Sequence, residues 1–180
     1  MEQEVILVND KDEQTGTMAK LPAHREGLLH RAFSVFIMNS RGEMLLQQRS
    51  PGKYHSPGLW TNACCSHPAP GEDTASAARR RLREELRFET DLSEIFHFTY
   101  RSSFDNGLTE HEFDHVFLGL YDGPLQPDPA EVSNHCFATP EQIETSLKEQ
   151  PEKFTSWFHI AFPMVQQWLK EHSNAPHPAP

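Results

Sequence analysis

The chain has 180 residues, of which 26 are acidic and 16 are basic, so its formal net charge is −10. This balance argues against a nucleic-acid-binding protein, because such proteins present a basic surface to their ligand. With 37% hydrophobic residues the chain can bury a core, and it has no apolar run of about 20 residues that could span a membrane.

Strands joined by turns are predicted for the first third of the chain. We expect extended segments at 4–8, 30–38, 43–49 and 60–67, and a loop rich in proline and glycine at 50–58. The sequence Asn39-Ser40-Arg41-Gly42 indicates a turn, so the apolar runs on either side of it are predicted to form a hairpin. The first strand is followed by a polar turn through Gly16.

A helix is predicted from Asp73 or Thr74 to about Arg87, because both possible first residues are good N-caps. An apolar stripe at helical spacing supports this interpretation. The stripe consists of Ala75, Ala78, Leu82 and Leu86.

The second half of the chain predicts paired strands followed by two helices. We expect strands at 95–104, 110–121 and 134–138, a loop at 122–129, and helices at 140–149 and 157–171. The first two strands flank the turn Asp105-Asn106-Gly107, and Pro163 is expected to interrupt or kink the last helix. The pattern predicts one domain over 1–171, of the α/β (α+β) class, and a disordered tail over 172–180.

The segment 60–68, which reads WTNACCSHP, carries candidate catalytic residues. Alternate side chains of an extended segment share a face, so Cys65 and His67 are predicted to point one way and Cys64 the other. Cys64 is then the candidate for packing and Cys65 for chemistry. Taken alone, a single Cys-x-His pattern is more often structural than catalytic.

Two further motifs supply possible metal ligands. Glu110 and Glu112 lie two residues apart on an expected strand, and therefore on one face. Taken alone, the pair fits a solvated edge strand better, but the apolar residues Phe113, Val116 and Phe117 favour a strand that enters the core. With His24, His30 and His67, the two carboxylates form a set that suits a five- or six-coordinate Mn²⁺, Mg²⁺ or Zn²⁺ ion.

The predicted helix carries a pattern that resembles the Nudix box, G-x5-E-x7-R-E-U-x-E-E-x-G-U, where U is apolar. The matching positions are Glu72, Arg80, Leu82, Glu84 and Glu85. The two glycines of the box are replaced by Ser66 and Arg87, and Arg81 stands where the box has a glutamate. In that family the box glutamates hold Mg²⁺ on a diphosphate.

These departures resemble those of type I isopentenyl-diphosphate isomerases, which are Nudix-fold proteins. That family carries W-T-N-x-x-C-x-H-P before a degenerate box, an E-x-E strand after it, and two histidines upstream of the first core strand. The matching residues are Trp60, Thr61, Asn62, Cys65, His67, Pro68, Glu110, Glu112, His24 and His30. The resemblance covers roughly 4–165, and it implies a mixed β-sheet sandwich flanked by helices.

The resemblance implies that isopentenyl diphosphate is isomerised to dimethylallyl diphosphate through a tertiary carbocation. The family's acid and base match Cys65 and Glu112, and the order in which they act is left open. Tyr100 matches a tyrosine that relays or orients a proton. Trp157 matches an aromatic residue that shields the cation. Without the resemblance, packing in the core is a strong alternative for both aromatic residues, and for Trp157 it explains the residue equally well.

The resemblance also implies how the diphosphate is held. Four basic positions match residues that contact it in the family, namely Lys20, Arg49, Lys53 and Arg81. Glu85 matches the ligand of a Mg²⁺ ion that arrives with the diphosphate, in addition to the ion at the His/Glu site. Arg81 in place of a box glutamate fits an enzyme that holds the diphosphate and does not hydrolyse it.

Two alternatives have different chemistry. A Nudix hydrolase of a nucleoside diphosphate derivative would need more of the box glutamates, and a catalytically inactive binding module would not need Cys65 with Glu112. The acidic N-terminus lacks a signal-peptide pattern, and Cys64, Cys65 and Cys136 are a poor disulfide framework. We therefore expect a cytoplasmic enzyme, a monomer or weak dimer, whose partner is a small-molecule diphosphate.

Overall fold

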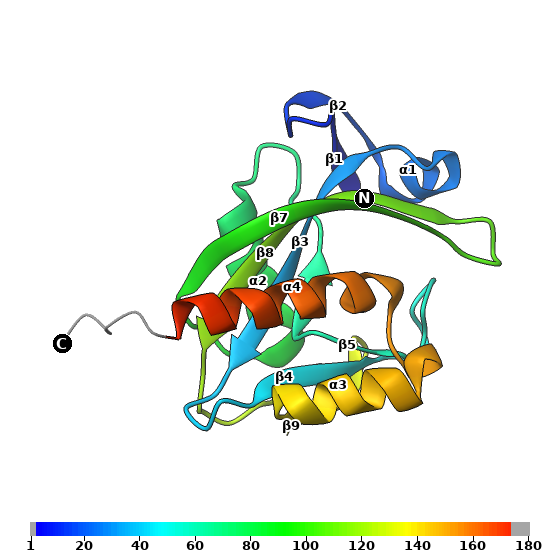
Figure 1. Cartoon of the computed structure of the whole chain (residues 1–180). Coiled ribbons are helices and arrows are strands. Elements are labelled where there is room, and N and C mark those ends of the chain that lie inside the picture. The colour runs from blue at the N-terminus through cyan, green and yellow to red at the C-terminus, as the bar shows by residue number, and fades with distance from the viewer. Residues whose placement is uncertain (1–2, 174–180) are drawn as a thin grey trace.

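The structure is a computed structural model that describes residues 3–173 (Figure 1). Its strands are β1 (Glu4–Val8), β2 (Gln14–Ala19), β3 (His30–Met38), β4 (Met44–Arg49), β5 (Trp60–Thr61), β6 (Cys64–Ser66), β7 (Leu92–Ser103), β8 (Thr109–Leu120) and β9 (Val132–Ala138). Its helices are α1 (Lys20–Glu26), α2 (Thr74–Leu86), α3 (Pro140–Glu149) and α4 (Ser156–His172), with a short 3-10 helix at Pro151–Lys153. The tail expected from residue 172 lies, from residue 174 onward, outside the described residues.

Strand β8 lies inside the sheet. It runs parallel to β3 along its length and antiparallel to β7, so it is paired on both edges. The acidic residues on β8 are therefore inside the sheet, and the alternative of a solvated edge strand is wrong. The expected hairpin of 30–38 with 43–49 forms only at its turn, where Met38 pairs with Met44. Beyond the turn the two strands take different partners: β3 pairs with β6 and β8, whereas β4 pairs with β5 and β9.

Helices cover the sheet on two sides, which confirms the expected mixed sheet flanked by helices. On one side the stripe of α2 packs on Phe33, Val35 and Ile37 of β3. On the other side α4 packs on Phe36 and Met38 of the same strand (Figure 1). Alternate residues of β3 thus serve two cores, as the two-residue period of a strand requires.

Helix α2 begins and ends close to the predicted residues. The side chain of Asp73 caps it by accepting from the backbone N–H of Ser76 at 2.9 Å, and Leu86 is its last residue. Arg87 follows in the left-handed conformation, with φ 61°. That conformation favours glycine, which explains why the Nudix box has glycine at this position.

The segments 4–19 and 60–67 differ from the prediction. The polar turn expected through Gly16 is strand β2, which pairs with β1 and leads into α1. The segment 60–67 divides into two short strands, β5 and β6, that pair with different neighbours. Helix α4 is not interrupted at Pro163, which lies on the exposed side of the helix.

No helix within residues 3–173 is both long enough and apolar enough to cross a membrane.

We expect Phe158→Ala to destabilise the fold by about 3–5 kcal/mol. Phe158 is fully buried, and its ring stacks between those of Phe154 and Phe162 at centroid distances of 5.6 and 5.4 Å. Urea unfolding of Ile160→Ala, a residue of the same helix that is 41% exposed, is the matched control and should change stability by less than about 1 kcal/mol. Equal losses in the two variants would contradict the assignment of α4 to the core.

Candidate active site

A cavity of about 310 Å³ is lined by residues of the central sheet, the loop after β4, and helices α2 and α4. Most of the expected site residues line it, namely Lys20, Arg49, Lys53, Cys65, His67, Arg81, Tyr100, Glu110, Glu112 and Trp157. The other three lie directly behind the wall: His24 and His30 contact His67, and Glu85 contacts Arg81.

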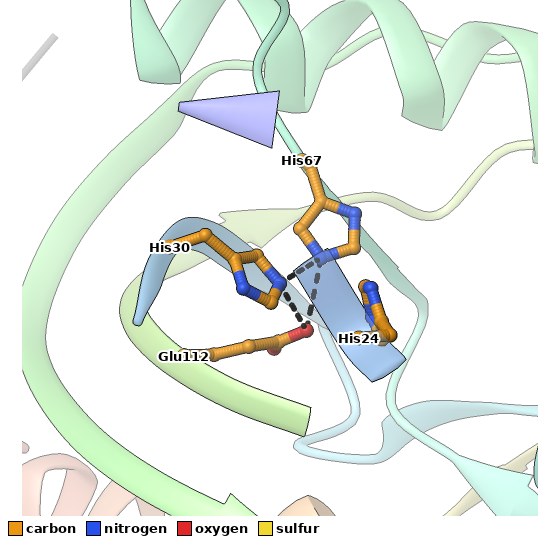
Figure 2. A group of neighbouring side chains, drawn as sticks. All are labelled: His24, His30, His67 and Glu112. Atoms are coloured by element: carbon orange, nitrogen blue, oxygen red, sulfur yellow. Dashed lines mark hydrogen bonds and ion pairs between the residues drawn. The ribbon is translucent and has the colours of Figure 1, made fainter. Parts of the chain in front are cut away.

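Four of the expected metal ligands converge on one point (Figure 2). The ligand atoms of His24, His30, His67 and Glu112 lie within 4.8 Å of one another, and all four residues are buried. Nε2 of His30 is 3.2 Å from Nε2 of His67, which is 2.9 Å from Oε1 of Glu112. Residues distant in the sequence thus present nitrogen and oxygen atoms to a common centre.

The tautomers of two histidines follow from their backbone contacts. Nδ1 of His24 is 2.7 Å from the carbonyl oxygen of Lys20, and Nδ1 of His30 is 2.8 Å from that of Leu28. Because a carbonyl only accepts, both Nδ1 atoms carry the proton and both Nε2 atoms present a lone pair. Nε2 of His24 is buried without a hydrogen-bond partner, which is costly unless a ligand or water completes it. These residues therefore fit a divalent metal ion.

Burial sets the charges of this cluster. It lowers the pKa of His24 to about 4 and that of His67 to about 3, so both imidazoles are neutral at neutral pH, as metal ligands must be. Burial by itself would raise the pKa of Glu112, but its contacts with His67 and His30 hold that pKa well below its usual value. The pKa of Glu110 is raised, first by burial and then by the negative charge of Glu112.

Glu110 and Glu85 do not join the four converging ligands. Glu110 is linked to Glu112 by Tyr100. The hydroxyl of Tyr100 lies 2.7 Å from Oε2 of Glu112 and 3.0 Å from Oε2 of Glu110. The neighbours of Glu110 within ligand distance are His24 and His55. The carboxylate of Glu85 instead accepts from Arg81 at 2.6 Å and from Gln47 at 3.1 Å, so it lies in a separate part of the site.

The predicted opposite orientation of the two adjacent cysteines is confirmed. Cys64 is fully buried in the core beneath α2, while Cys65 lines the cavity. The sulfur of Cys65 lies 3.1 Å from Nε1 of Trp157 and 3.1 Å from Oδ1 of Asn62. Both amide N–H groups of Asn62 are used by backbone carbonyls, so its oxygen is held in position to accept the thiol proton.

Four basic side chains give the cavity local positive charge within an acidic protein. The guanidinium of Arg49 lies over the ring of Trp157, 5.3 Å from its centroid. Burial lowers the pKa of Lys20 to about 8 and also lowers that of Lys53. Glu131 pairs with Lys53 and lies 3.4 Å from Arg81, so a carboxylate of the chain occupies the position where an external anion would meet these cations.

Sequence reasoning missed several residues of this site. The cavity is also lined by Ser34, Tyr54, His55 and Glu131, and buried Asp114 accepts from Ser34 at 2.7 Å. Asp114 continues the two-residue spacing of Glu110 and Glu112, which was an available indication. Nothing in the sequence around His55 or Glu131 indicates that a loop brings them to the cations and carboxylates.

The chain is similar in sequence to known proteins. Residues 28–158 match the family model described as NUDIX domain. The chain is 48% identical over 165 residues to Isopentenyl-diphosphate Delta-isomerase of Pectobacterium atrosepticum, and the match covers 92% of each chain. It is also 48% identical to the protein of that name from Serratia proteamaculans, over 88% of each chain.

Solved structures show the same fold. The crystal structure of DR0079 from Deinococcus radiodurans superposes with a TM-score of 0.69 at 27% identity, covering 82% of this chain and 90% of that one. A MutT protein from Methanosarcina mazei superposes with a TM-score of 0.65 at 18% identity, over 81% of this chain and 96% of that one. The second likeness, at its low identity, concerns the fold alone.

We expect the thiol of Cys65 to resist ionisation at alkaline pH. Burial, followed by the nearby carboxyl group of Asp114, raises its pKa to about 12, whereas an ordinary thiol ionises near pH 8.5. Alkylation of Cys65 by iodoacetamide in metal-free protein, measured by peptide mass spectrometry, should therefore still rise about tenfold per pH unit between pH 7 and 10. A plateau near pH 9 would contradict this.

The same shift has a consequence for stability. Above about pH 8.5 the unfolded chain loses the thiol proton that the folded chain retains. The contribution of Cys65 to folding stability should therefore decrease as the pH rises from there toward 12.

Proposed function

The chain belongs to the isopentenyl-diphosphate Delta-isomerases, which carry a NUDIX domain, and from this membership we propose a mechanism for its cavity. The reaction moves the double bond of isopentenyl diphosphate and forms dimethylallyl diphosphate. The reaction supplies precursors for isoprenoid biosynthesis. The observation that carries the proposal is that Cys65 and Glu112 line one cavity, where burial raises the pKa of the thiol and contacts with two histidines lower the pKa of the carboxyl group. A double-bond shift requires one proton donor and one proton acceptor.

Protonation of the terminal alkene carbon generates a tertiary carbocation, and loss of a proton from the carbon next to the diphosphate-bearing carbon completes the shift. Cys65 and Glu112 are the two groups that exchange these protons with the substrate. The hydroxyl of Tyr100 lies 2.7 Å from Glu112. It orients that carboxylate and can relay a proton to or from it. Because the reaction is reversible, donor and acceptor exchange roles between the two directions.

The carbocation must be kept from water until the second proton leaves. Trp157 is only 2% exposed and forms part of the cavity wall, and an aromatic face stabilises a cation by about 0.5–2 kcal/mol. Its indole N–H contacts the sulfur of Cys65, so the ring is fixed beside one of the proton-transfer groups. Arg49 contacts the same ring and keeps it in position.

The diphosphate is assigned to the basic side of the cavity, where Lys20, Arg49, Lys53 and Arg81 gather. Glu85 would hold the Mg²⁺ ion that arrives with the diphosphate, and His24, His30, His67, Glu110 and Glu112 would hold a Mn²⁺, Mg²⁺ or Zn²⁺ ion. When bound, these ions neutralise charge on the diphosphate and on the buried carboxylates. Arg81 occupies a position where hydrolases of the superfamily carry a glutamate, so the diphosphate is held and not cut.

The setting of the reaction follows from the same chemistry. We propose that residues 1–171 act as one domain in the cytoplasm, as a monomer or weak dimer, on a small-molecule substrate and without nucleic acid or a membrane. The alternative of a Nudix hydrolase is less specific, because it rests on the NUDIX fold alone and gives no reason for Cys65.

The proposal is tested by incubating the metal-loaded protein with isopentenyl diphosphate and Mg²⁺ in D₂O. We expect deuterium-labelled dimethylallyl diphosphate, detected by mass spectrometry. Cys65→Ala and Glu112→Gln should each abolish turnover, whereas Cys64→Ala, the matched control in the core, should retain most of it. Released phosphate would indicate a hydrolase, and the absence of product and exchange from a folded, metal-loaded sample would overturn the isomerase assignment.

A separate prediction concerns Glu131, which pairs with Lys53 and Arg81 in the absence of an anion. Glu131→Gln removes the competing carboxylate, so inorganic pyrophosphate without Mg²⁺ should bind about threefold to tenfold more tightly, since each freed cation can then form a charge-assisted hydrogen bond. Isothermal titration calorimetry measures this, with exposed Glu152→Gln as the control. Weaker binding would show instead that Glu131 holds the cations in their working positions.

A further inference from the structure

Asn62 is a fully buried residue between β5 and β6, and its side chain contacts the proton-transfer residue Cys65. Its amide nitrogen lies 3.0 Å from the carbonyl oxygen of Val35 and 2.9 Å from that of Cys64. Because carbonyl oxygens only accept, these two contacts use both amide hydrogens and fix which end of the amide is the oxygen. The oxygen Oδ1 is therefore the end that meets the thiol, and it offers two lone pairs.

Three donors surround Oδ1 of Asn62. The donor atoms are Oγ1 of Thr61 at 2.9 Å, Sγ of Cys65 at 3.1 Å and Nε1 of Trp157 at 3.3 Å. The indole N–H also has a second acceptor, because Nε1 is 3.1 Å from the sulfur of Cys65. Since an amide oxygen has two lone pairs, two of these donors must share one of them.

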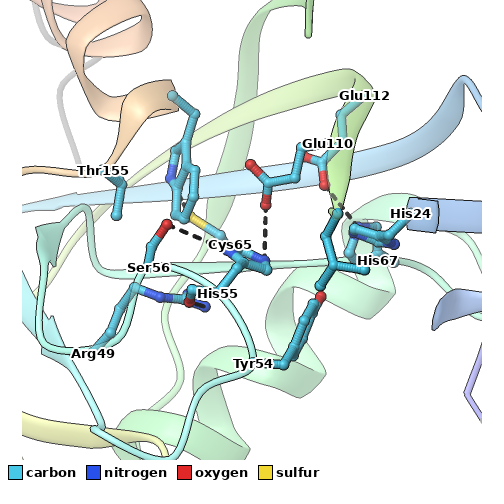
Figure 3. A network of polar contacts seen from close by, with 12 residues as sticks. His24, Arg49, Tyr54, His55, Ser56, Cys65, His67, Glu110, Glu112 and Thr155 are labelled. Carbon is cyan, nitrogen blue, oxygen red and sulfur yellow. Dashed lines mark hydrogen bonds and ion pairs between the residues drawn. The ribbon is translucent and has the colours of Figure 1, made fainter. Parts of the chain in front are cut away.

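The hydroxyl of Thr61 occupies one lone pair, because a second hydroxyl fixes its direction. Thr61 is 1% exposed, and Thr155, the residue before α4, is fully buried. Their hydroxyl oxygens lie 2.9 Å apart. The proton of Thr61 is used on Asn62, so Thr155 is the donor in this pair. Figure 3 shows Thr155 at the start of α4, in the same polar network as Cys65.

The thiol and the indole are left to share the other lone pair. When the thiol hydrogen lies on Oδ1 of Asn62, the indole N–H lies on the sulfur, and the thiol hydrogen is directed at the buried amide. When the indole N–H moves to Oδ1, the thiol hydrogen turns into the cavity, where Oγ of Ser34 lies 3.7 Å from the sulfur. Ser34 donates its own proton to Asp114, so its oxygen can accept. Only this second arrangement presents the proton to a substrate.

We propose that Thr61 is a positioning residue for the proton transfer of Cys65. By occupying one lone pair of Asn62, it makes the thiol and the indole N–H of Trp157 exchange at the other. The thiol hydrogen then becomes available to the alkene carbon, and after its transfer the electron pair of the S–H bond remains on the sulfur, to which the indole N–H can return. In the reverse direction the same sulfur accepts the proton. The inference rests on the proposed function, because it assigns a role in its transfer step.

Thr61→Val tests the proposal, because valine has nearly the shape of threonine but lacks the hydroxyl. Asn62 can then accept from the thiol and the indole together, so the thiol hydrogen stays on the amide. The kcat for isopentenyl diphosphate should fall about twofold to tenfold, which corresponds to one hydrogen bond, while KM changes by less than about twofold. Thr61→Ser restores the hydroxyl and should restore kcat.

Thr155→Val is the matched control for the structural part of the same hydroxyl pair. It removes the side-chain contact between the start of α4 and β5, as Thr61→Val does. It leaves the hydroxyl of Thr61 to donate to Asn62, however, so kcat should stay close to that of the unaltered protein.

Raman spectroscopy of the S–H stretch supplies a readout that needs no substrate. Subtracting the spectrum of Cys65→Ala isolates the band of Cys65 from those of Cys64 and Cys136. In Thr61→Val this band should move to lower wavenumber, because a thiol that donates a hydrogen bond has a weaker S–H bond. Thr61→Ser and Thr155→Val should leave the band in its original position, and circular dichroism establishes that each variant is folded.

Three results would overturn the proposal: an unshifted S–H band in Thr61→Val, an equal loss of kcat in Thr61→Val and Thr155→Val, or no recovery of kcat in Thr61→Ser. A failure of the proposed function looks different. In that case the unaltered protein also leaves isopentenyl diphosphate unchanged, and the Raman comparison still decides whether Thr61 sets the direction of the thiol hydrogen.

Discussion

Three carboxylates on one face of the buried strand β8 are the constraint to which the rest of the site responds. Glu110, Glu112 and Asp114 are each no more than 6% exposed, and the penalty for burying an unpaired ion is several kcal/mol. Hydrogen bonds and imidazoles hold Glu112 ionised, whereas burial raises the pKa of Glu110 and of Asp114. Histidines from α1, β3 and the segment after β6 meet these carboxylates, and together the residues fit a divalent ion that would offset this concentration of negative charge.

The acidity of the chain places a second demand on the site. A net charge of −10 repels an anionic substrate at a distance, so the site must recruit the diphosphate locally. Lys20, Arg49, Lys53 and Arg81 gather in the cavity, where the lower dielectric strengthens each interaction. Because Lys53 and Arg81 meet Glu131, the cations remain partly neutralised, and the protein avoids an uncompensated buried positive cluster.

The helix that carries the degenerate Nudix box shows how a shared scaffold acquires different chemistry. Arg81 turns toward Glu85 and Glu131, so a position that supplies a carboxylate in the box supplies a cation here. The box has glycine at position 87, where Arg87 adopts the left-handed backbone conformation. The fold therefore tolerates the replacement of this glycine by arginine. The helix keeps its cap and apolar stripe, and the substitutions alter the charge that it brings to the cavity.

The sequence alone determined the features that depend on local spacing: the helix at 74–86, the pairing of the two long strands around Gly107, and the opposite faces of Cys64 and Cys65. Together with the family resemblance, it named most of the residues that line the cavity. Only the tertiary structure decided that β3 and β4 diverge, that Glu110 faces His55, and that Glu131 meets Lys53. The reason is physical: periodicity assigns a side chain to a face, whereas the partner on that face comes from a distant segment that only chain packing brings near.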